Sequence, residues 1–447
     1  MKKIVYVLLF ISSILHSQCI QKYSAGDWST FAIKDGVLYA WGQVSISETY
    51  QSHYIGSNLP RNIGMDTDWS SVSVGSNTMV AKKNDGTIWT YSLLCIGGSQ
   101  HNGYPADFSS IGLTYQIGTE TDWDKIYLGG HHTLALKTNG TLWSWGLNQY
   151  GETGNLIGGL SDLPVQVGSA SDWVKIYAGV SHSLAIKSDG SLWAWGLGNY
   201  GQIGDWNETS RNTPVYVGTT NDWLNATAGS DCSFGIKTNG TLWAWGRNNN
   251  GQLGIGNHDN KNTPVQVGTI NNWLKVVSYS NAEYYESQTI ALKTDGTIWK
   301  REGMYFIQIG TENNWQDIDM GVSHFIASKT DGTVWTWGDN YSGQLGLGST
   351  WGTFNTPQLV NCSQWVALGI NDIEPAQISA YIYPNPAKNE FTFTNLKDEY
   401  DFQIINSLGQ TIQHGTAMNN TKIDVGDLSK GIYYVKINQE TIKLIKY

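Results

Sequence analysis

Short stretches in which apolar and polar residues alternate follow one another through most of the chain. In TLWSWG (141–146), Trp143 and Trp145 fall on one face of an extended strand. Leu142 and Ser144 fall on the other face. Asn-Gly or Asp-Gly pairs stand between such stretches, and they favour hairpins in which both turn residues have positive φ. The pattern therefore predicts short antiparallel strands joined by tight turns.

The strands belong to a unit that recurs along the chain. One copy, DWVKIYAGVSHSLAIKSDGSLWAWGLGNYGQIGDWNETSRNTPVYVG, covers residues 172–218. Its leading tryptophan recurs at intervals of 54, 50, 50, 50, 42 and 50 residues, as Trp69, Trp123, Trp173, Trp223, Trp273, Trp315 and Trp365. The turn glycine also recurs seven times, at Gly36, Gly86, Gly140, Gly190, Gly240, Gly296 and Gly332. Each unit provides four strands, because one begins at the leading tryptophan and another follows the proline of segments such as NTPVYVG.

Repeated four-stranded sheets cannot each bury two faces alone. Radial stacking buries both faces and leaves only short edges, which is the architecture of a β-propeller. A linear solenoid is the alternative, but it would need capping units, and none is evident in the sequence. The expected fold is all-β, a seven-bladed β-propeller.

The composition agrees with this fold. Trp, Tyr and Phe number 21, 24 and 10 in 447 residues, and charged residues make up 14%, where an ordinary soluble domain has about 25%. So many aromatic residues with so little charge exclude a disordered chain. The formal net charge of -10 argues against a nucleic-acid partner, whose phosphates require clustered Lys and Arg.

The repeat resembles that of the regulator of chromosome condensation family. The matching signature is a GxxH turn, a short apolar strand and then GxLWxWGxNxxGQLG. It is fullest at residues 142–154, 192–204, 242–254 and 334–346. The resemblance covers about residues 20–370 and implies a seven-bladed propeller. Blade 1 departs from it with Tyr39, blade 2 with Tyr91-Ser92 and blade 6 with Arg301-Glu302.

Ring closure involves the last unit, QWVALG from Gln364, which has a leading strand and nothing after it. Members of the resembled family usually complete one blade from both termini, so we expect this segment to join blade 1. Cys19 and Cys362 fall near that seam, either as a disulfide or as two separate buried thiols. The remaining cysteines are Cys95 and Cys232, and no CxxC pair indicates a zinc site.

The N-terminus predicts export. Lys2 and Lys3 precede an apolar run over 4–15, and cleavage is plausible after Ser17 or Gln18. Residues 1–18 are therefore a predicted signal peptide, and an uncleaved anchor is the alternative. The predicted propeller covers 19–370, a linker 371–379, and a further domain 380–447.

The C-terminal domain shows alternating strands separated by turn signals, enough for a small Ig-like β-sandwich. It resembles the sorting domain of type IX (Por) secretion cargo at Tyr383–Pro386, Asn406–Gly409, Gly431–Tyr433 and Lys443–Lys446. This resemblance implies export through the periplasm of a Gram-negative, Bacteroidota-like cell. The protein would then be secreted or anchored at the outer surface.

The residues that could carry chemistry give no catalytic pattern. His132, His182 and His324 each stand nine residues after a leading tryptophan, where Cys232 and Thr78 occupy two other units. A metal-binding ring would need them together, but they lie on different blades, so packing is the expected role. HExxH, GxSxG and phosphate loops do not occur. We predict neither an enzyme nor a cofactor or metal site.

Unit length varies mostly where the first strand connects to the second and the third to the fourth, and alternating strand direction places these loops on one rim. Loops on a rigid scaffold often carry binding, and exposed aromatic residues provide contact area. Neutral loop drift is the alternative. The candidate partner-binding residues are Glu48, Tyr50, His53, Tyr54, His101, Tyr104, Phe108, Glu283, Tyr284, Tyr285 and Glu286.

These observations favour a secreted or cell-surface protein that uses its propeller as a scaffold for protein–protein interaction. Its partner would be an unknown protein or a glycan, besides the type IX secretion machinery. We expect a monomer with no nucleic-acid partner and no membrane span in the mature chain. A lectin-like, glycan-binding adhesin is the alternative, and a hydrolase with its site in the central channel is a third hypothesis.

Overall fold

The computed structural model describes residues 20, 22–46, 53–64, 66–75, 79–90, 115–156, 158–279, 288–361, 365, 381–383, 387–394, 396, 398–406, 410–437 and 440–446. The chain divides into two compact units at residue 367/368. Both units are built from β-strands, as the alternating pattern predicts. The described residues include no helix long and apolar enough to cross a membrane.

Seven four-stranded sheets, here called blades 1 to 7, form the described part of the first unit. Blades 1 to 3 contain β1 (Lys22–Ala25), β2 (Ser29–Lys34), β3 (Val37–Ile46) and β4 (His53–Asn62); β5 (Trp69–Val74), β6 (Met79–Lys83), β7 (Ile88–Thr90) and β8 (Tyr115–Gln116); and β9 (Trp123–Leu128), β10 (His132–Lys137), β11 (Leu142–Asn148) and β12 (Gly159–Gln166). Blades 4 and 5 contain β13 (Trp173–Ala178), β14 (His182–Lys187), β15 (Leu192–Gly196) and β16 (Arg211–Tyr216), then β17 (Trp223–Ala228), β18 (Cys232–Lys237), β19 (Leu242–Gly246) and β20 (Lys261–Gln266). Blades 6 and 7 contain β21 (Trp273–Tyr279), β22 (Gln288–Lys293), β23 (Ile298–Glu302) and β24 (Tyr305–Gln308), then β25 (Trp315–Met320), β26 (His324–Lys329), β27 (Val334–Asp339) and β28 (Thr353–Leu359).

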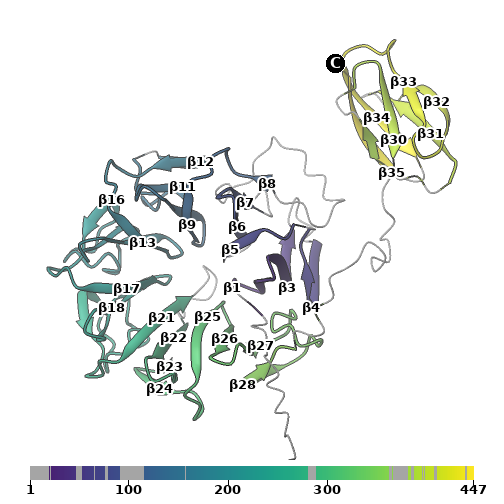
Figure 1. Ribbon diagram of the computed structural model, residues 1–447. Helices are drawn as coiled ribbons and strands as arrows, with labels where there is room; N and C mark the ends of the chain where they lie inside the picture. Colours follow the sequence, from purple (N-terminus) through teal and green to yellow (C-terminus); the bar gives the residue numbers. More distant parts are fainter. Residues whose placement is uncertain are drawn as a thin grey trace, which may run out of the picture. The chain divides into compact units, whose positions relative to one another are not determined.

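The blades stand around a common centre, with the first strand of each blade innermost (Figure 1). Strands follow chain order within each blade. The innermost strands contact their neighbours in sequence, and β25 contacts β1, so the ring closes. The predicted propeller is confirmed.

Hydrophobic cores lie between neighbouring blades. Leu184 and Ile186 of β14 pack with Trp223 of β17 and Trp245 of β19, for example. Each sheet thus buries both faces against the sheets on either side, which is what a single four-stranded sheet cannot do alone.

The hairpin turns differ from the prediction in six of the seven blades. In blade 3 the glycine Gly140 has φ +78°, but Asn139 is not among the described residues with positive φ. The N–H of Gly140 donates to the carbonyl of Lys137 at 2.9 Å, and the N–H of Lys137 donates to the carbonyl of Thr141 at 3.1 Å. Three residues therefore separate the strands, and a type I turn followed by a left-handed glycine closes them. Only Asp35-Gly36, a two-residue turn, has positive φ at both positions among the described residues.

Trp365 completes blade 1, as the sequence predicts. Its ring centroid lies 4.9 Å from that of Tyr39 and 5.5 Å from that of Trp41. In blade 3 the leading tryptophan, Trp123, packs in the same way against Trp143. The C-terminal end of the repeat region therefore supplies the leading tryptophan to a blade whose strands come from the N-terminus. Cys19 and Cys362 lie outside the described residues, so their pairing stays a prediction.

A lysine stacks between two tryptophans in each of blades 2 to 7. In blade 5, Nζ of Lys237 lies 5.1 and 4.6 Å from the ring centroids of Trp223 and Trp243. The same ammonium group lies 3.0 Å from Oδ1 of Asp222. The aspartate that often precedes the leading tryptophan is thereby explained, because it pairs with this lysine.

Replacing Lys237 with methionine is expected to lower the free energy of unfolding by about 1–2 kcal/mol, because the stem is kept while the desolvated cation–π contacts are lost. Urea unfolding followed by tryptophan fluorescence would measure it. Lys261→Met is the matched control, since among the described residues its acidic partner is Asp259, at 3.4 Å on the surface. Equal losses in the two variants would contradict the stacking argument.

The second unit consists of two sheets. One has the order β29 (Tyr381–Tyr383), β30 (Glu390–Thr394), β33 (Lys422–Asp424), and the other β32 (Thr411–Ala417), β31 (Tyr400–Ile405), β34 (Gly431–Ile437), β35 (Glu440–Lys446). Both sheets contribute to one hydrophobic core, in which Phe391 and Phe393 of β30 meet Phe402 of β31 and Val435 of β34. The strands agree with the predicted small sandwich, and its Ig-like character stays a prediction.

Candidate functional site

Most of the predicted partner-binding residues lie outside the described part of the chain. These are Glu48, Tyr50, His101, Tyr104, Phe108, Glu283, Tyr284, Tyr285 and Glu286. His53 and Tyr54 begin β4, where their backbones pair with Ile46 and Ser45 of β3. Those pairs mark the rim end of blade 1, as expected, and the role of the loops stays a prediction.

The described loops of the same rim expose aromatic side chains that the sequence analysis did not select. Four of them stand between the third and fourth strands of their blades, and Tyr305 begins the fourth strand of blade 6. Trp206 is 55% exposed and Trp351 is 78% exposed. The full set is Tyr150, Trp206, Tyr305, Tyr341 and Trp351. Blades 3, 4, 6 and 7 thus each present at least one aromatic ring at the rim.

Trp206 has a strained backbone. Its φ is +69°. The equivalent positions are Gly256 and Gly348 in blades 5 and 7, both with φ of +79°, and Leu156 in blade 3, with φ of +65°. The left-handed conformation is sterically unfavourable for a residue with a side chain. Both non-glycine residues at this position, Trp206 and Leu156, are exposed, so blades 3 and 4 each present an apolar side chain to solvent from a strained backbone.

The loop around Trp206 is held by several contacts. The N–H of Trp206 donates to the carbonyl of Asn262 on blade 5 at 3.0 Å, and Nδ2 of Asn262 donates to the carbonyl of Trp206 at 3.1 Å. Next to it, Nε of Arg211 donates to Oδ2 of Asp205 at 2.6 Å. The indole is therefore presented on a braced loop and would lose little conformational entropy on binding.

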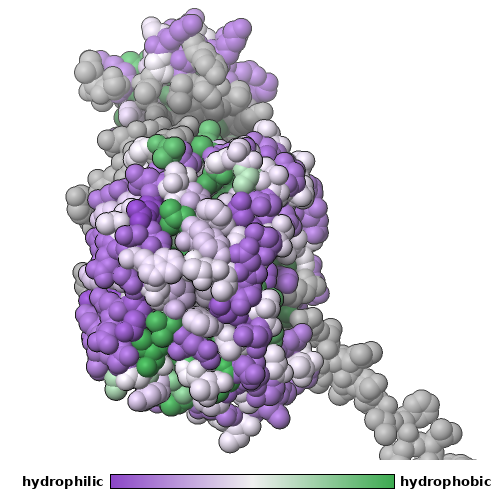
Figure 2. Space-filling view, turned by 90° about the vertical axis from the view of Figure 1, so that its left-hand side faces the viewer, coloured by the Kyte–Doolittle hydropathy of each residue, from purple (hydrophilic) through white to green (hydrophobic). Residues whose placement is uncertain are grey.

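The side of the molecule that carries β16 to β18 is shown in Figure 2. Hydrophilic and neutral residues cover most of it, and hydrophobic residues form small separate groups. A partner approaching this side would meet isolated apolar side chains surrounded by polar ones.

The repeated histidines hold neighbouring blades together. Nε2 of His182 lies 2.8 Å from Oγ of Ser233 on the next blade, and this hydroxyl donates to the carbonyl of Gln202 at 2.8 Å. Because the hydroxyl hydrogen is used there, His182 must donate from Nε2. Nε1 of Trp245 donates to the same carbonyl at 2.9 Å. We call this arrangement the histidine latch.

Two further latches have the same geometry. Nε2 of His132 lies 2.7 Å from Oγ of Ser183, and Nε2 of His324 lies 2.9 Å from Oγ1 of Thr30. The latch of His324 joins blade 7 to blade 1, so the seam is bonded like the internal interfaces. Burial lowers the pKa of His132 and His324 to about 3 and that of His182 to about 4. The histidines therefore act as neutral structural groups, in line with the packing role expected for them.

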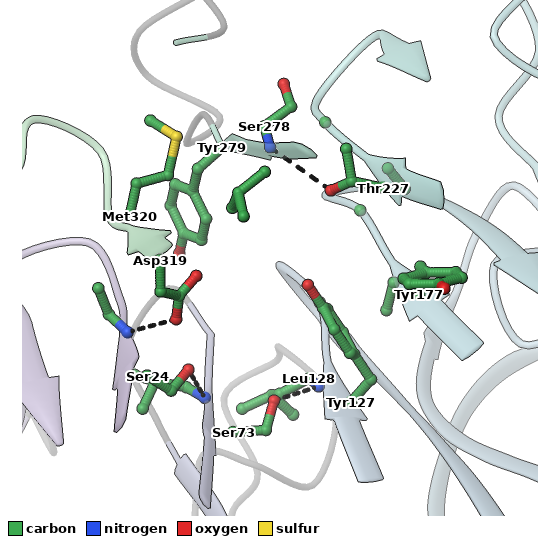
Figure 3. A pocket seen from close by; sticks show the side chains of 18 of the residues that line it. Ser24, Ser73, Tyr127, Leu128, Tyr177, Thr227, Ser278, Tyr279, Asp319 and Met320 are labelled. Atoms are coloured by element: carbon green, nitrogen blue, oxygen red, sulfur yellow. Dashed lines mark hydrogen bonds between the residues drawn. The ribbon is translucent and has the colours of Figure 1, made fainter. Parts of the chain in front are cut away.

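A cavity of about 230 Å³ occupies the centre of the ring (Figure 3). All seven innermost strands line it. Its polar groups include the hydroxyls of Tyr127 and Tyr177 and the carboxylate of Asp319. The Tyr177 hydroxyl donates to Oδ1 of Asn225 at 2.5 Å. Within the described ranges, no three His, Cys, Asp or Glu side chains gather so as to hold a metal ion.

One position recurs around this cavity, the fourth residue after the leading tryptophan, which in blade 1 corresponds to Ser24 of β1. Its side-chain oxygen accepts a hydrogen bond from a backbone N–H of the next blade. The pairs are Val74 N–H to Ser24 at 3.2 Å, Leu128 N–H to Ser73 at 2.9 Å, Ser278 N–H to Thr227 at 3.4 Å and Ala25 N–H to Asp319 at 3.1 Å. Asp319 is the charged member of these four. The periodic placement of Ser, Thr and Asp after the tryptophan was the sequence signal that could have revealed this ring.

Comparison with known protein families identifies both units. The model of the regulator of chromosome condensation (RCC1) repeat matches residues 139–186, 189–236, 239–281 and 331–370, and a second model of the same repeat matches 123–152, 173–202 and 315–344. The secretion system C-terminal sorting domain matches 381–447. The chain therefore contains RCC1 repeats and a sorting tail, as the resemblances implied.

Solved structures share the fold. Yeast RCC1 (Prp20) in the complex with Kap60 is 16% identical, with a TM-score of 0.60 over 81% of this chain and 91% of that one. Human WBSCR16 is 18% identical, with a TM-score of 0.48 over 76% of this chain and 81% of that one. Beta-agarase A of Zobellia galactanivorans is 33% identical over 82 residues, which are 18% of this chain and 15% of the agarase.

Proposed function

We propose that this secreted chain, with its propeller of RCC1 repeats and its sorting tail, is a binding protein that holds another protein on the loop rim of the ring. The propeller is the scaffold and performs no covalent chemistry. The sorting tail carries it across the outer membrane, where the tail is removed or the protein is anchored. The observation that carries the proposal is Trp206, an indole that is 55% exposed and held at positive φ, at a position occupied by glycine in blades 5 and 7 and by Leu156 in blade 3.

The physical argument rests on rigidity combined with exposed aromatic area. Aromatic side chains contribute strongly to protein interfaces because they bury a large area for few rotatable bonds. Trp206 and Trp351 offer such area on the described rim. The histidine latches keep the rim geometry constant between blades. Partner choice would then depend on loop tips, including the irregular loops of blades 1, 2 and 6.

Trp206→Gly and Trp351→Ala together are expected to weaken binding at least tenfold. The fold should be stable to within about 1 kcal/mol, because glycine relieves the backbone strain at residue 206. Proteins retained from an extracellular extract by the immobilised wild-type chain would be identified, purified and measured by biolayer interferometry against each variant. The matched control is Leu359→Ala, which removes an exposed apolar side chain from β28, away from the loops. If the double variant binds every purified partner as tightly as the control does, the rim is not the site.

A glycan is the second candidate partner. The observation that favours it is the pair of amide side chains beside one exposed ring, Asn207 and Asn262 next to Trp206. Sugar rings stack on aromatic faces and hydrogen-bond to such amides. Co-sedimentation with insoluble polysaccharides, again comparing the wild type with Trp206→Gly, separates the two candidates. Saturable sedimentation lost in the variant would identify a lectin-like adhesin.

A further inference from the structure

The charge of Asp319 is not needed for the contact that this residue makes. Ser24, Ser73 and Thr227 accept the equivalent backbone N–H with a hydroxyl. Asp319 accepts the N–H of Ala25 with Oδ2 at 3.1 Å, and a serine there would do the same. The cavity therefore carries a carboxylate where the repeat can close the ring without one.

No cation of the described residues forms an ion pair with Asp319. The lysine of the cavity, Lys275, lies 2.7 Å from Oδ1 of Asp317 and is paired with it. Burial raises the pKa of Asp319 to about 6, above the usual range of a carboxyl group, although the charge of Lys275 partly opposes that rise. A buried carboxylate without an ion-pair partner is unfavourable unless a cation or hydrogen-bond donors compensate for its charge.

The opposite wall of the cavity is aromatic. Tyr127 directs its hydroxyl into the cavity, toward the side that carries Asp319 (Figure 3). The ring of Tyr177 stands edge-on to that of Tyr127, with centroids 6.0 Å apart. Met320 and Tyr279 complete the wall around the carboxylate (Figure 3). A carboxylate facing tyrosine rings is the combination that recognises organic ammonium groups.

We propose that the central cavity binds a small organic cation with a primary ammonium group, which pairs with Asp319 and donates to the hydroxyl of Tyr127. The volume of about 230 Å³ lies below the range of roughly 300–1,000 Å³ of sites for drug-sized ligands, so the ligand is a compact amine. A calcium ion fits less well, because it requires six to eight oxygen ligands and binds best where several of them are carboxylates, and Asp319 is the only acidic residue among the described residues that line the cavity. This site is separate from the loop rim and does not depend on the proposed function.

The test is isothermal titration calorimetry of the full chain at pH 7.5 with 1,4-diaminobutane, tetramethylammonium, 1,4-butanediol and calcium chloride. Saturable, one-to-one binding of the diamine, with neither the diol nor calcium bound, is the expected result. Tetramethylammonium should bind at least threefold more weakly, because it cannot donate a hydrogen bond. Absence of diamine binding, or calcium binding at equal strength, would overturn the proposal.

Asp319→Ser and Asp319→Asn should each weaken diamine binding at least tenfold, while thermal unfolding at pH 7.5 stays at or above the wild-type temperature. Tyr127→Phe keeps the ring and should weaken binding by about threefold, and it leaves the Ala25 contact untouched. Asp189→Asn changes the net charge equally at a surface hairpin and should bind like the wild type. Wild-type affinity in both Asp319 variants would exclude this carboxylate as the recognition group.

Discussion

Replacing Trp365 with alanine is expected to lower the free energy of unfolding of the propeller by about 3–5 kcal/mol, the range for truncating a buried tryptophan. Trp365 is buried in the core of blade 1, where it packs on Tyr39 and Trp41. Its loss leaves a cavity at the seam, where the C-terminal end of the repeat region meets the strands from the N-terminal end. Guanidinium unfolding followed by tryptophan fluorescence measures the change.

Trp351→Ala is the matched control for this prediction. It removes the same side chain from a position that is 78% exposed, and surface substitutions usually change stability by less than about 0.5 kcal/mol. If Trp365→Ala does not fold, Trp365→Tyr is measured instead. Its free energy of unfolding should lie below that of the wild type by less than the roughly 3–5 kcal/mol expected for alanine. A loss at Trp365 no larger than at Trp351 would mean that this residue does not close the ring.

Lowering the pH from 7 to 5 should destabilise the propeller by several kcal/mol through the histidine latches. The pKa values of His132, His182 and His324 in the folded chain are about 3, 4 and 3, against about 6.5 in an unfolded chain. Between these limits the unfolded state binds more protons, so stability falls as the pH falls. Each histidine contributes about 1.4 kcal/mol per pH unit inside that window.

Asp319 acts in the opposite direction. Its pKa is raised to about 6, from about 3.9 in an unfolded chain. Between these values the folded state binds more protons, so this carboxyl stabilises the fold as the pH falls. The three histidines lower the free energy of unfolding as the pH falls, and the single carboxyl raises it. The net decrease is roughly 3 kcal/mol per pH unit between about pH 4 and 6. Denaturation midpoints at pH 7.5, 6.0 and 5.0 measure it.

A residue of the same repeat suggests a variant that tests whether the histidine latches cause this pH dependence of stability. Cys232 occupies the histidine position in blade 5 and is fully buried there. His182→Cys should therefore fold and should reduce the pH dependence by about 1.4 kcal/mol per unit, while the hydroxyl of Ser233 keeps its bond to the Gln202 carbonyl. An unchanged pH dependence in this variant would show that the latch does not titrate as described.

The periodic part of the fold could be predicted because the same physical problem recurs in every unit. Alternation places Trp143 and Trp145 on one face of a strand, and the recurring tryptophan gives the repeat length. The interval pattern even revealed Trp365 as a leading residue without a following unit. Turn geometry was the exception. The pair Asn139-Gly140 also fits a two-residue turn, and only the strand pairing shows that Thr138 belongs to the loop as well.

The candidate sites were harder to predict, because they depend on departures from the repeat. In the sequence, Trp206 cannot be distinguished from other loop residues. The structure shows that its φ is positive, as it is at the equivalent Gly256 and Gly348 of other blades. In the sequence, Asp319 resembles the acidic residues of turns and of the surface. Its place in the central cavity becomes apparent only when the closed ring brings β25 beside β1. Neither feature follows from alternation, since each arises from contacts between units about 50 residues or more apart in the sequence.

Because Trp365 fills a core built from the first strands, that core stays incomplete until residue 365 has left the ribosome. The sorting domain, residues 381–447, follows it in the chain. A chain truncated anywhere in the repeats would lack both Trp365, which completes the core of blade 1, and the sorting domain. Closure of blade 1 and the sorting domain thus both depend on residues that are synthesised after the rest of the propeller.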